Sequence, residues 1–341
     1  MNNNHSTSNS TSTRSSQRNN GGITQAGIRR ARIGRRALWL LFGLYVVVFI
    51  IYLYAPLIVT GVLAFNNSDI PSFPWKGLTL DWFYNPNYGK VEVEDETESA
   101  GQIGIGRTGG RVGVFNDQDL LASIKNSFYV AIAVTALSLV VGTTTALLFE
   151  RNRFKGDTLL YFAMLAPLVI PGVILGVSIL VFGNSIVGPL RAIFGRETVK
   201  PIVSLLRPGL FIVVLGQFAW IATMTTLIIS ARLRRFPMVQ EDAAMDLGAS
   251  RFKAITSITI PFLRPALLSA GVVAFLLSFE NFGTTLFLIG SDPTLPILFF
   301  SRLRFEITPQ INAVSVVLIL GTILLGLAAL GLEQLRSSGR G

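Results

Sequence analysis

The sequence predicts an all-α membrane protein with six transmembrane helices. Of its 341 residues, 50% are hydrophobic and only 14% are charged, and the mean hydropathy is +0.56. Soluble globular proteins carry about 25% charged residues, so this shortfall indicates a lipid environment. The apolar residues form long continuous runs. A helix that spans a membrane needs such a run of about 20 residues, whereas a transmembrane β-barrel shows an alternating pattern.

The first predicted elements are a polar, basic tail at residues 1–36 and a transmembrane helix at residues 37–65. The tail is rich in Asn, Ser, Thr, Gln and Gly and ends in a cluster of arginines. It can bury too little apolar surface to fold, so we expect disorder. The apolar run that follows is much longer than the core of about 7–15 residues in a signal peptide, and no cleavage site follows it. We therefore expect a retained helix.

Five further apolar runs predict the other transmembrane helices, within a transmembrane domain at residues 121–332. One run contains Pro167 and Pro171, which are tolerated where neighbouring helices satisfy the freed carbonyl groups. Gly172 and Gly176 in the same run are four residues apart, a spacing that favours close helix packing. The predicted helices are Ser127–Phe149, Leu159–Phe182, Ile202–Ile229, Ala266–Ile289 and Ala313–Leu332.

The distribution of Lys and Arg predicts that both ends of the chain are cytoplasmic. Segments 1–36, 150–158, 231–265 and 333–341 then lie inside and hold 18 of the 29 basic residues, in line with the positive-inside rule. The loop before the fourth helix departs from this rule, with four basic residues outside. The excess on the inner side accounts for the net charge of +10 without nucleic acid as a partner.

A long loop at residues 66–120 is predicted on the outer side. Its part at residues 85–119 is acidic and then Gly-rich, which is typical of a flexible insertion. Gly104, Gly106 and Gly109 spell G-x-G-x-x-G there, but the strand and the helix that dinucleotide binding requires are not evident. The chain contains no Walker A sequence, so any ATP that the protein uses must bind to another chain.

Residues that most catalytic and metal sites require are scarce. The chain contains no cysteine, and its single histidine is His5 in the tail. This excludes most pairs of nucleophile and base, and the thiolate and histidine metal sites. We therefore expect no cofactor and no bound metal. An enzyme embedded in the membrane would depend on carboxylates alone, so this class fits poorly.

A polar segment between two apolar runs, EDAAMDLGASRF, predicts two short helices that meet at a glycine. Pro237 suits the first turn of a helix, and Glu241 and Asp242 lie near its positive end. Gly248 can end that helix in the left-handed conformation, and Ser250 can cap a second helix. The charge distribution places this pair of helices in the cytoplasm.

The composition of the first short helix predicts a docking site for a cytosolic protein. Ala243 and Ala244 let a partner approach closely, and the acids beside them offer charge-assisted contacts. The alternative is an amphipathic helix on lipid headgroups. That alternative expects basic and large apolar residues rather than this acidic, Ala-rich sequence.

One acid, Glu280 in the sequence SFENF, is predicted well inside the fifth apolar run. A charge at mid-membrane costs roughly 2.5–3.5 kcal/mol on insertion scales, so such residues usually face a cavity or a partner. With Ser278 and Asn281, Glu280 is a candidate for attracting a cation in a translocation path. The alternative is a structural carboxyl paired with another helix or chain. Gln217 is a weaker candidate, because such polar side chains often bridge helices.

The segment from Asp242 to Pro261, DAAMDLGASRFKAITSITIP, resembles the EAA loop of inner-membrane permeases of ABC importers. That loop contains a Glu-Ala-Ala triplet, then a glycine, and later an aliphatic residue and a proline. Asp242 stands at the Glu position, which keeps the charge and shortens the side chain. The other matching residues are Ala243, Ala244, Gly248, Ile258 and Pro261.

A wider resemblance covers residues 37–332, outside the insertion. The sequences WKGLTLDWFYN, APLVIPGVILGVSIL and SFENF are similar to the second permease subunit of spermidine/putrescine importers, in which an acid stands at the position of Glu280. The resemblance implies the type I ABC importer permease fold with a cytoplasmic coupling helix. It implies polyamine import too, although close relatives carry ferric iron, phosphonate or other small solutes.

The same resemblance implies partners and roles. A second, homologous permease subunit would complete the pore, a dimer of ABC ATPase subunits would bind the coupling helices, and a binding protein would deliver solute outside the inner membrane. This chain would not be a catalyst. The implied ATPase-coupling residues are Glu241, Asp242, Ala243, Ala244, Gly248 and Pro261. The candidate residues of the substrate pathway are Glu280, Asn281, Ser278 and Gln217.

A different class of function, an ion-coupled secondary transporter, is the remaining alternative. Such proteins usually carry several ionisable groups within the membrane. The predicted helices contain one acid, Glu280, and a secondary transporter would leave the docking segment unexplained.

Overall fold

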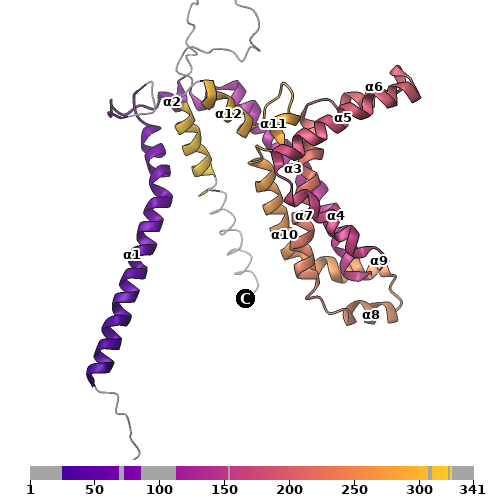
Figure 1. Ribbon diagram of the computed structural model, residues 1–341, viewed down its shortest axis with the longest axis horizontal. Coiled ribbons are helices and arrows are strands. Elements are labelled where there is room, and N and C mark those ends of the chain that lie inside the picture. The colour runs from indigo at the N-terminus through magenta and orange to yellow at the C-terminus, as the bar shows by residue number, and fades with distance from the viewer. Residues whose placement is uncertain are drawn as a thin grey trace, which may run out of the picture. The chain divides into compact units, whose positions relative to one another are not determined.

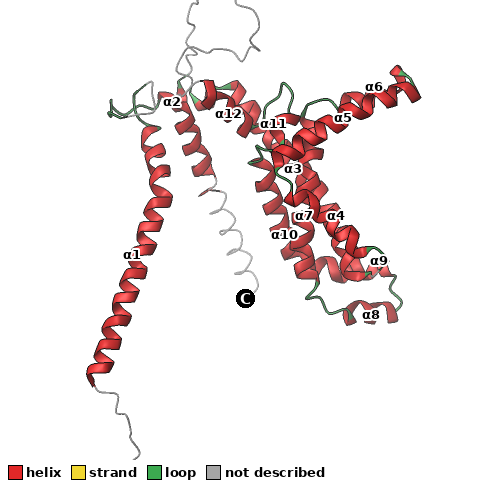
Figure 2. Cartoon of the chain, viewed as in Figure 1, coloured by secondary structure: helices red, strands yellow, loops and turns green. Residues whose placement is uncertain are grey.

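The computed structural model describes residues 25–68, 73–85, 113–152, 154–305, 309–321 and 323–324. Regular secondary structure in this part is helical, with one antiparallel bridge between Asn66 and Leu78 (Figure 2). The all-α prediction is confirmed for these residues. The predictions for the start of the polar tail, for most of the insertion and for the C-terminal tail lie outside the described residues.

Helix α1 (Gln25–Leu63) belongs, up to Val59, to a unit of its own. It begins at Gln25, before the arginine cluster. The prediction of a disordered tail up to residue 36, with the helix starting at Ala37, is therefore wrong for residues 25–36, which are helical. Its part Leu38–Leu63 is long and apolar enough to cross a membrane, and nearly all of the side chains there are exposed. A helix that is apolar on all sides requires lipid or other membrane helices around it.

Three long helices pack together as the core of the second unit (Figure 1). They are α3 (Gln118–Arg151), α7 (Leu210–Leu233) and α10 (Ile260–Phe279). Small side chains let α3 and α7 approach each other. A Cβ atom on Gly142 would lie 2.9 Å from Cγ2 of Thr225, so the glycine permits a backbone contact that is typical of membrane helices.

The prediction of one helix over Leu159–Phe182 is wrong, because the chain forms α4 (Asp157–Val169) and α5 (Gly172–Phe194) instead. Ile170 is extended, with a ψ of 127°, since the ring of a following proline disfavours the helical conformation. Pro171 also lacks the N–H group that would continue the helix. Of the two helices, α5 is long enough to cross a membrane.

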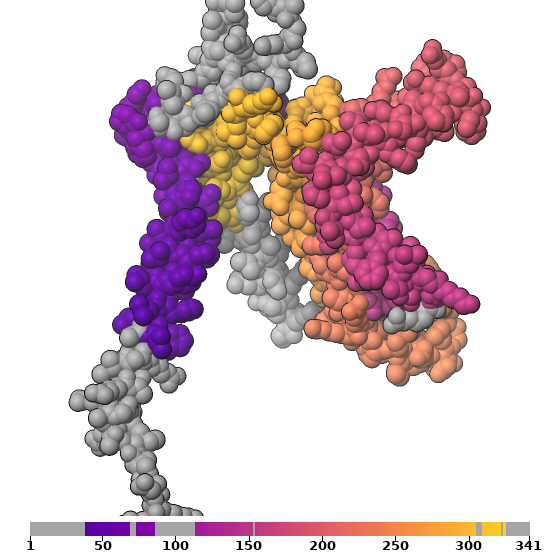
Figure 3. Space-filling view, in the orientation of Figure 1, coloured from indigo at the N-terminus to yellow at the C-terminus, as the bar shows by residue number. Residues whose placement is uncertain are grey.

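The fourth and fifth predicted helices have different bounds in the structure. The start of the fourth run belongs to α6 (Arg196–Leu205), which continues from α5 away from the three-helix core (Figure 3). After a turn that contains proline and glycine, α7 begins at Leu210. The fifth run is helical only to Phe279, and a turn separates it from the short helix α11 (Thr285–Leu288).

Five helices of the described part, rather than the six predicted, are long and apolar enough to cross a membrane. The sixth predicted helix, Ala313–Leu332, is described only at its start, within a shorter apolar helix at Gln310–Gly321. The rest of that prediction lies outside the described residues. The five long segments are Leu38–Leu63, Gln118–Arg151, Gly172–Phe194, Leu210–Leu233 and Arg251–Phe279.

Besides the three-helix core, an apolar cluster joins segments that are far apart in the sequence. Its buried side chains include Trp82, Leu120, Leu298 and Ala313. The short elements that contribute to it are α2 (Asp81–Tyr84), η1 (Val114–Asn116) and α12 (Leu295–Phe305). It packs the start of α3 against α12 and against the helix of residues 310–321.

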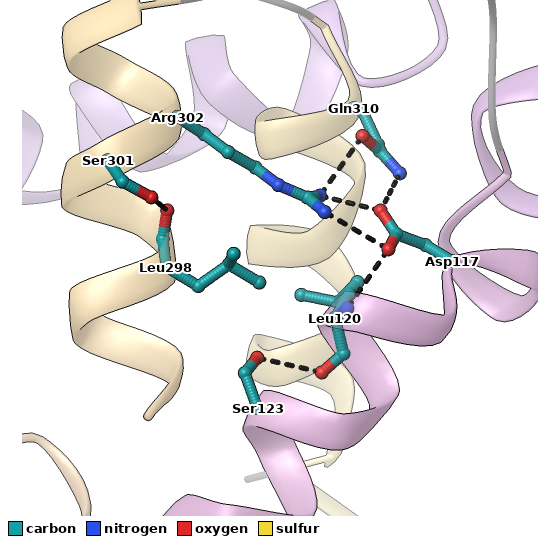
Figure 4. A network of polar contacts seen from close by, with 7 residues as sticks. All are labelled: Asp117, Leu120, Ser123, Leu298, Ser301, Arg302 and Gln310. Atoms are coloured by element: carbon teal, nitrogen blue, oxygen red, sulfur yellow. Dashed lines mark hydrogen bonds and ion pairs between the residues drawn. The ribbon is translucent and has the colours of Figure 1, made fainter. Parts of the chain in front are cut away.

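A polar network beside this cluster is centred on Asp117 (Figure 4). Oδ1 of Asp117 accepts from the backbone N–H of Leu120 at 3.0 Å, which caps α3. Arg302 of α12 donates to both carboxylate oxygens, at 2.6 and 3.0 Å, and Nε2 of Gln310 donates at 2.8 Å. The network therefore joins three helices through one buried carboxylate.

Candidate coupling loop and polar pathway

The predicted meeting of two helices at Gly248 is confirmed. Helix α8 (Val239–Asp246) ends there, and Gly248 has a φ of +88°. The N–H of Gly248 donates to the carbonyl of Met245 at 2.9 Å, and the N–H of Ala249 donates to that of Ala244 at 3.0 Å. These two bonds form a Schellman motif, which pairs the last carbonyl groups of a helix.

The second helix also begins as expected and then runs on into α10. Oγ of Ser250 accepts from the N–H of Lys253 at 3.3 Å and caps α9 (Arg251–Ala254). A π-helical turn, η2 (Ile255–Thr259), joins α9 to α10, so Pro261 lies in a helix that continues for many residues. Pro237 precedes α8 instead of lying in its first turn, because α8 begins at Val239.

The residues of α8 fall into two groups by exposure. Asp242, Ala243 and Gly248 are exposed, and so is Leu247, whose exposed fraction is 91%. Glu241 is only 2% exposed and is the one buried residue of α8. The two adjacent acids therefore have different surroundings, which the sequence alone did not separate.

Glu241 lies in a cluster with Arg151 and Thr259, which we call the Glu241 cluster. Nη1 of Arg151 donates to Oε2 of Glu241, and the hydroxyl of Thr259 donates to Oε1. Nη2 of Arg151 also donates to Thr259 Oγ1 at 3.3 Å. Because Arg151 ends α3 and Thr259 lies in η2, the cluster connects α8 to two core helices.

Three candidate residues of the substrate pathway form one chain of hydrogen bonds. Oγ of Ser278 donates to Oε1 of Gln217, whose Nε2 donates to Oγ1 of Thr285 at 2.8 Å. Thr285 Oγ1 in turn donates to Oδ1 of Asn281 at 3.0 Å. Gln217 thus bridges helices, as such residues often do, and Thr285 is the member that sequence analysis missed. No spacing signal pointed to Thr285, since its partners come from another helix and from the turn.

Glu280 was predicted to lie well inside the fifth transmembrane helix, and this prediction is wrong. Glu280 is the C-cap of α10, where the chain turns, and its side chain is exposed. It lies beside the hydrogen-bonded chain in sequence but makes no ion pair with any residue that the structure describes. An exposed carboxylate at a helix break remains available to a partner or a solute.

A pocket of about 420 Å³ lies where two helix breaks meet. The break between α4 and α5 contributes Ile170 and Pro171, and the turn after α10 contributes Asn281 and Thr284. Trp220 of α7 completes the lining. Thr284 Oγ1 and Trp220 Nε1, from two residues of the lining, are buried without a hydrogen-bond partner among the described residues, which is unusual for buried polar groups.

The close packing predicted for Gly172 and Gly176 is confirmed at this pocket. A Cβ atom on Gly176 would lie 2.6 Å from the carbonyl oxygen of Thr284, and one on Gly172 would lie 3.1 Å from Thr284 Oγ1. Glycine at both positions therefore lets α5 pack directly on the turn after α10. Among the described residues no group of three or more His, Cys, Asp or Glu could hold a metal ion.

Comparison with known families identifies the chain. Residues 122–336 match the family model described as the binding-protein-dependent transport system inner membrane component, which covers more than half of the sequence. The chain belongs to this family of ABC importer permeases. The permease is thus a multi-pass protein of the inner membrane that works with an ATPase and a binding protein and is not itself catalytic.

Individual relatives of the permease agree with this assignment. It is 28% identical over 274 residues to the putrescine transport system permease protein PotI of Escherichia coli K12, covering 80% of this chain and 83% of the relative. It is 22% identical over 291 residues to the spermidine/putrescine transport system permease protein PotC of the same strain, covering 85% and 92%.

A solved structure shares the fold of the permease. The crystal structure of a bacterial ABC transporter involved in the import of the acidic polysaccharide alginate matches with a TM-score of 0.54. The match covers 88% of this chain and 97% of that one, at 11% sequence identity. This likeness supports the helical architecture and says nothing of the solute.

Proposed function

We propose that this permease imports polyamines such as spermidine and putrescine, and that α8 is its coupling helix for the ATPase. The observation that carries the coupling role is the exposed tip of α8, at Asp242, Ala243 and Leu247, set at a left-handed glycine. Leu247 directly follows this helix of eight residues and is almost completely exposed. Such an exposed leucine favours contact with a partner, because apolar side chains gain free energy when a partner covers them.

The acid and the alanine of this tip have separate roles in docking. Asp242 supplies a charge that can accept hydrogen bonds from basic groups of an ATPase groove. Ala243 is small, so the backbone of α8 can lie close to the walls of that groove. Gly248 and Pro261 set the course of the chain after the tip, and Ala244 is partly covered by the chain itself.

The polyamine proposal rests on the relatives and on one acid. PotI and PotC are named for putrescine and spermidine transport, and Glu280 is exposed next to Asn281, which lines the pocket at the helix breaks. In a site of low dielectric constant, a carboxylate attracts an ammonium group more strongly than it does in water. Ferric iron, phosphonate or another small solute is the alternative cargo of the same machinery.

The family and the charge pattern support a proposal for the assembly. We propose six transmembrane helices with both termini in the cytoplasm, a second homologous permease that completes the pore, and two ATPase subunits beneath. A binding protein delivers the solute on the outer side. Nucleic acid has no place in this assembly, because the basic residues lie mostly in the cytoplasmic segments.

Uptake of labelled spermidine tests the proposal. Vesicles would contain this permease, its partner permease and the ATPase, with the binding protein added outside. We expect ATP-dependent uptake that unlabelled putrescine competes away. A complex that assembles and hydrolyses ATP but ignores both polyamines would exclude the polyamine proposal and leave the coupling role intact.

A further inference from the structure

Helix α8 is attached to the rest of the permease by a carboxylate rather than by apolar contacts. Glu241 is the only buried residue of α8, while its apolar side chains, such as Val239, are exposed. A helix of eight residues is marginal in water on its own. The contacts of Glu241 therefore hold α8 in place.

The Glu241 cluster reaches the ends of all three core helices. Arg151 is the last residue of α3, and Thr259 lies in η2, which leads into α10. The guanidinium of Arg151 lies 5.4 Å from the ring centroid of Phe236, which follows α7. The Phe236 ring also packs on Phe262 of α10, with 5.1 Å between centroids. In Figure 1, α8 and α9 lie near the ends of α7 and α10 that the cluster joins.

The π turn η2 contains two threonines, Thr256 and Thr259, that have different surroundings although nothing in the sequence distinguishes them. Thr259 is fully buried and bonds to Glu241, whereas Thr256 is exposed and donates only to carbonyl groups of its own helix. A π turn holds an extra residue compared with an α-helix, so it changes which side chains face a neighbour, and such turns often mark functional sites.

The cluster resists separation because its charges are buried. The side chains of Arg151 and Glu241 are 4% and 3% exposed. A buried charge is costly unless it is paired and hydrogen-bonded, and each oxygen of Glu241 has its own donor. Moving α8 away from α3 or from η2 would leave a buried charge or hydroxyl without its partner.

We propose that the Glu241 cluster is the mechanical link of the permease, so that α8 moves as one body with the cytoplasmic ends of α3 and α10. Glu241 is a positioning residue that acts through Arg151 and Thr259, and of the two adjacent acids only Asp242 faces the partner. This inference rests on the proposed docking of α8 to an ATPase, and it assigns the adjacent acids to different tasks.

The link is tested by a distance measurement that needs neither substrate nor ATPase. The chain contains no cysteine, so Gln240→Cys on α8 and Val140→Cys on α3, both exposed, accept spin labels without background. We expect a single narrow distance distribution in the purified permease. Thr259→Val and Glu241→Gln should broaden it, and Thr256→Val should leave it unchanged.

The functional consequence is measured as solute taken up per ATP hydrolysed, with labelled spermidine in the complete complex. Thr259→Val should lower this ratio by about tenfold, the order expected for loss of a buried hydrogen bond to a charged group. Thr259→Ser, which keeps the hydroxyl, should restore it. A purely structural role would instead lower the amount of complex and leave the ratio unchanged.

Two results would overturn the link. One is a distance distribution that stays as narrow in Thr259→Val as in the parent protein. The other is an uptake ratio that is the same in the valine and serine variants. Failure of the ATPase to copurify with the parent permease would refute the proposed docking function instead, and the distance measurement would still decide on the link.

Discussion

Glu280 and Glu241 show how the surroundings of a carboxylate decide what it can do. Glu241 is enclosed and has both oxygens bonded, so its charge is used within the chain. Glu280 ends α10 with its side chain exposed, so its charge is available to a solute or a partner subunit. The sequence ranked both as functional acids, and only the tertiary contacts distinguish them.

Glu280→Gln should weaken uptake of a polycation and spare assembly. The substitution keeps size and polarity and removes the charge, so the KM for spermidine should rise by about tenfold, which is ~1.4 kcal/mol of lost attraction. Asp292→Asn is the control, because Asp292 is also exposed, in the loop before α12. Uptake assays on both variants check this. Equal effects of the two substitutions would reduce Glu280 to a general surface charge.

The lowered pKa of Asp117 predicts that the stability of the permease depends on pH. Burial acts to raise the pKa of its carboxyl, but hydrogen bonds from Arg302 and from the backbone of Leu120, with the charge of Arg302, hold that pKa below the ordinary value of 3.8. A depressed folded-state pKa stabilises the protein above about pH 3.8, and this stabilisation is lost as the pH falls through the folded-state pKa.

The measurement for Asp117 is the thermal stability of the purified permease in detergent, from neutral pH down to about pH 3. We expect the parent protein to lose more stability over this range than Asp117→Asn, which has no carboxyl to titrate there. Asp119→Asn, an exposed acid in the first turn of α3, should follow the parent curve. Parallel curves for the parent and Asp117→Asn would contradict the prediction.

At the scale of elements, Gly248 ends α8 and sets the direction of the coupling loop. Gly248→Val should uncouple transport while leaving membrane insertion intact, because a β-branched residue at a φ of +88° is strained by about 1–2 kcal/mol. Gly156→Val is a matched control, since Gly156 has a φ of +93° in a loop outside the coupling element. ATP-driven uptake should be lost only in the first variant, and normal uptake there would refute the coupling role of this turn.

The two helices that meet at Gly248 were predictable from the sequence, and the helix breaks were not. Helix caps depend on residues a few positions apart in the sequence. Gly248 therefore predicts the end of one helix, and Ser250 predicts the start of the next. Hydropathy cannot find a break at Ile170 and Pro171, because both residues are as apolar as the helices they separate. The polar chain from Ser278 to Thr285 depends on the packing of α7 against α10, which no local pattern encodes.

For the whole molecule, the end that carries α8 and the end that carries α6 should lie on opposite sides of the membrane. The tip of α8 exposes Leu247, and α6 exposes Ser204. Because the chain has no native cysteine, Leu247→Cys and Ser204→Cys can each be labelled with a maleimide that does not cross membranes. The two variants thus report the orientation and the docking surface in one experiment.

We expect Leu247→Cys to react only in inside-out vesicles and Ser204→Cys only in right-side-out vesicles. Bound ATPase should protect Leu247→Cys, because a side chain that is 91% exposed in the chain becomes covered when α8 enters the groove of its partner. Ser204→Cys should react equally with and without the ATPase. Labelling from the reverse sides would invert the topology inferred from the basic residues. Labelling of Leu247→Cys that the ATPase does not affect would place the docking surface elsewhere on the cytoplasmic face.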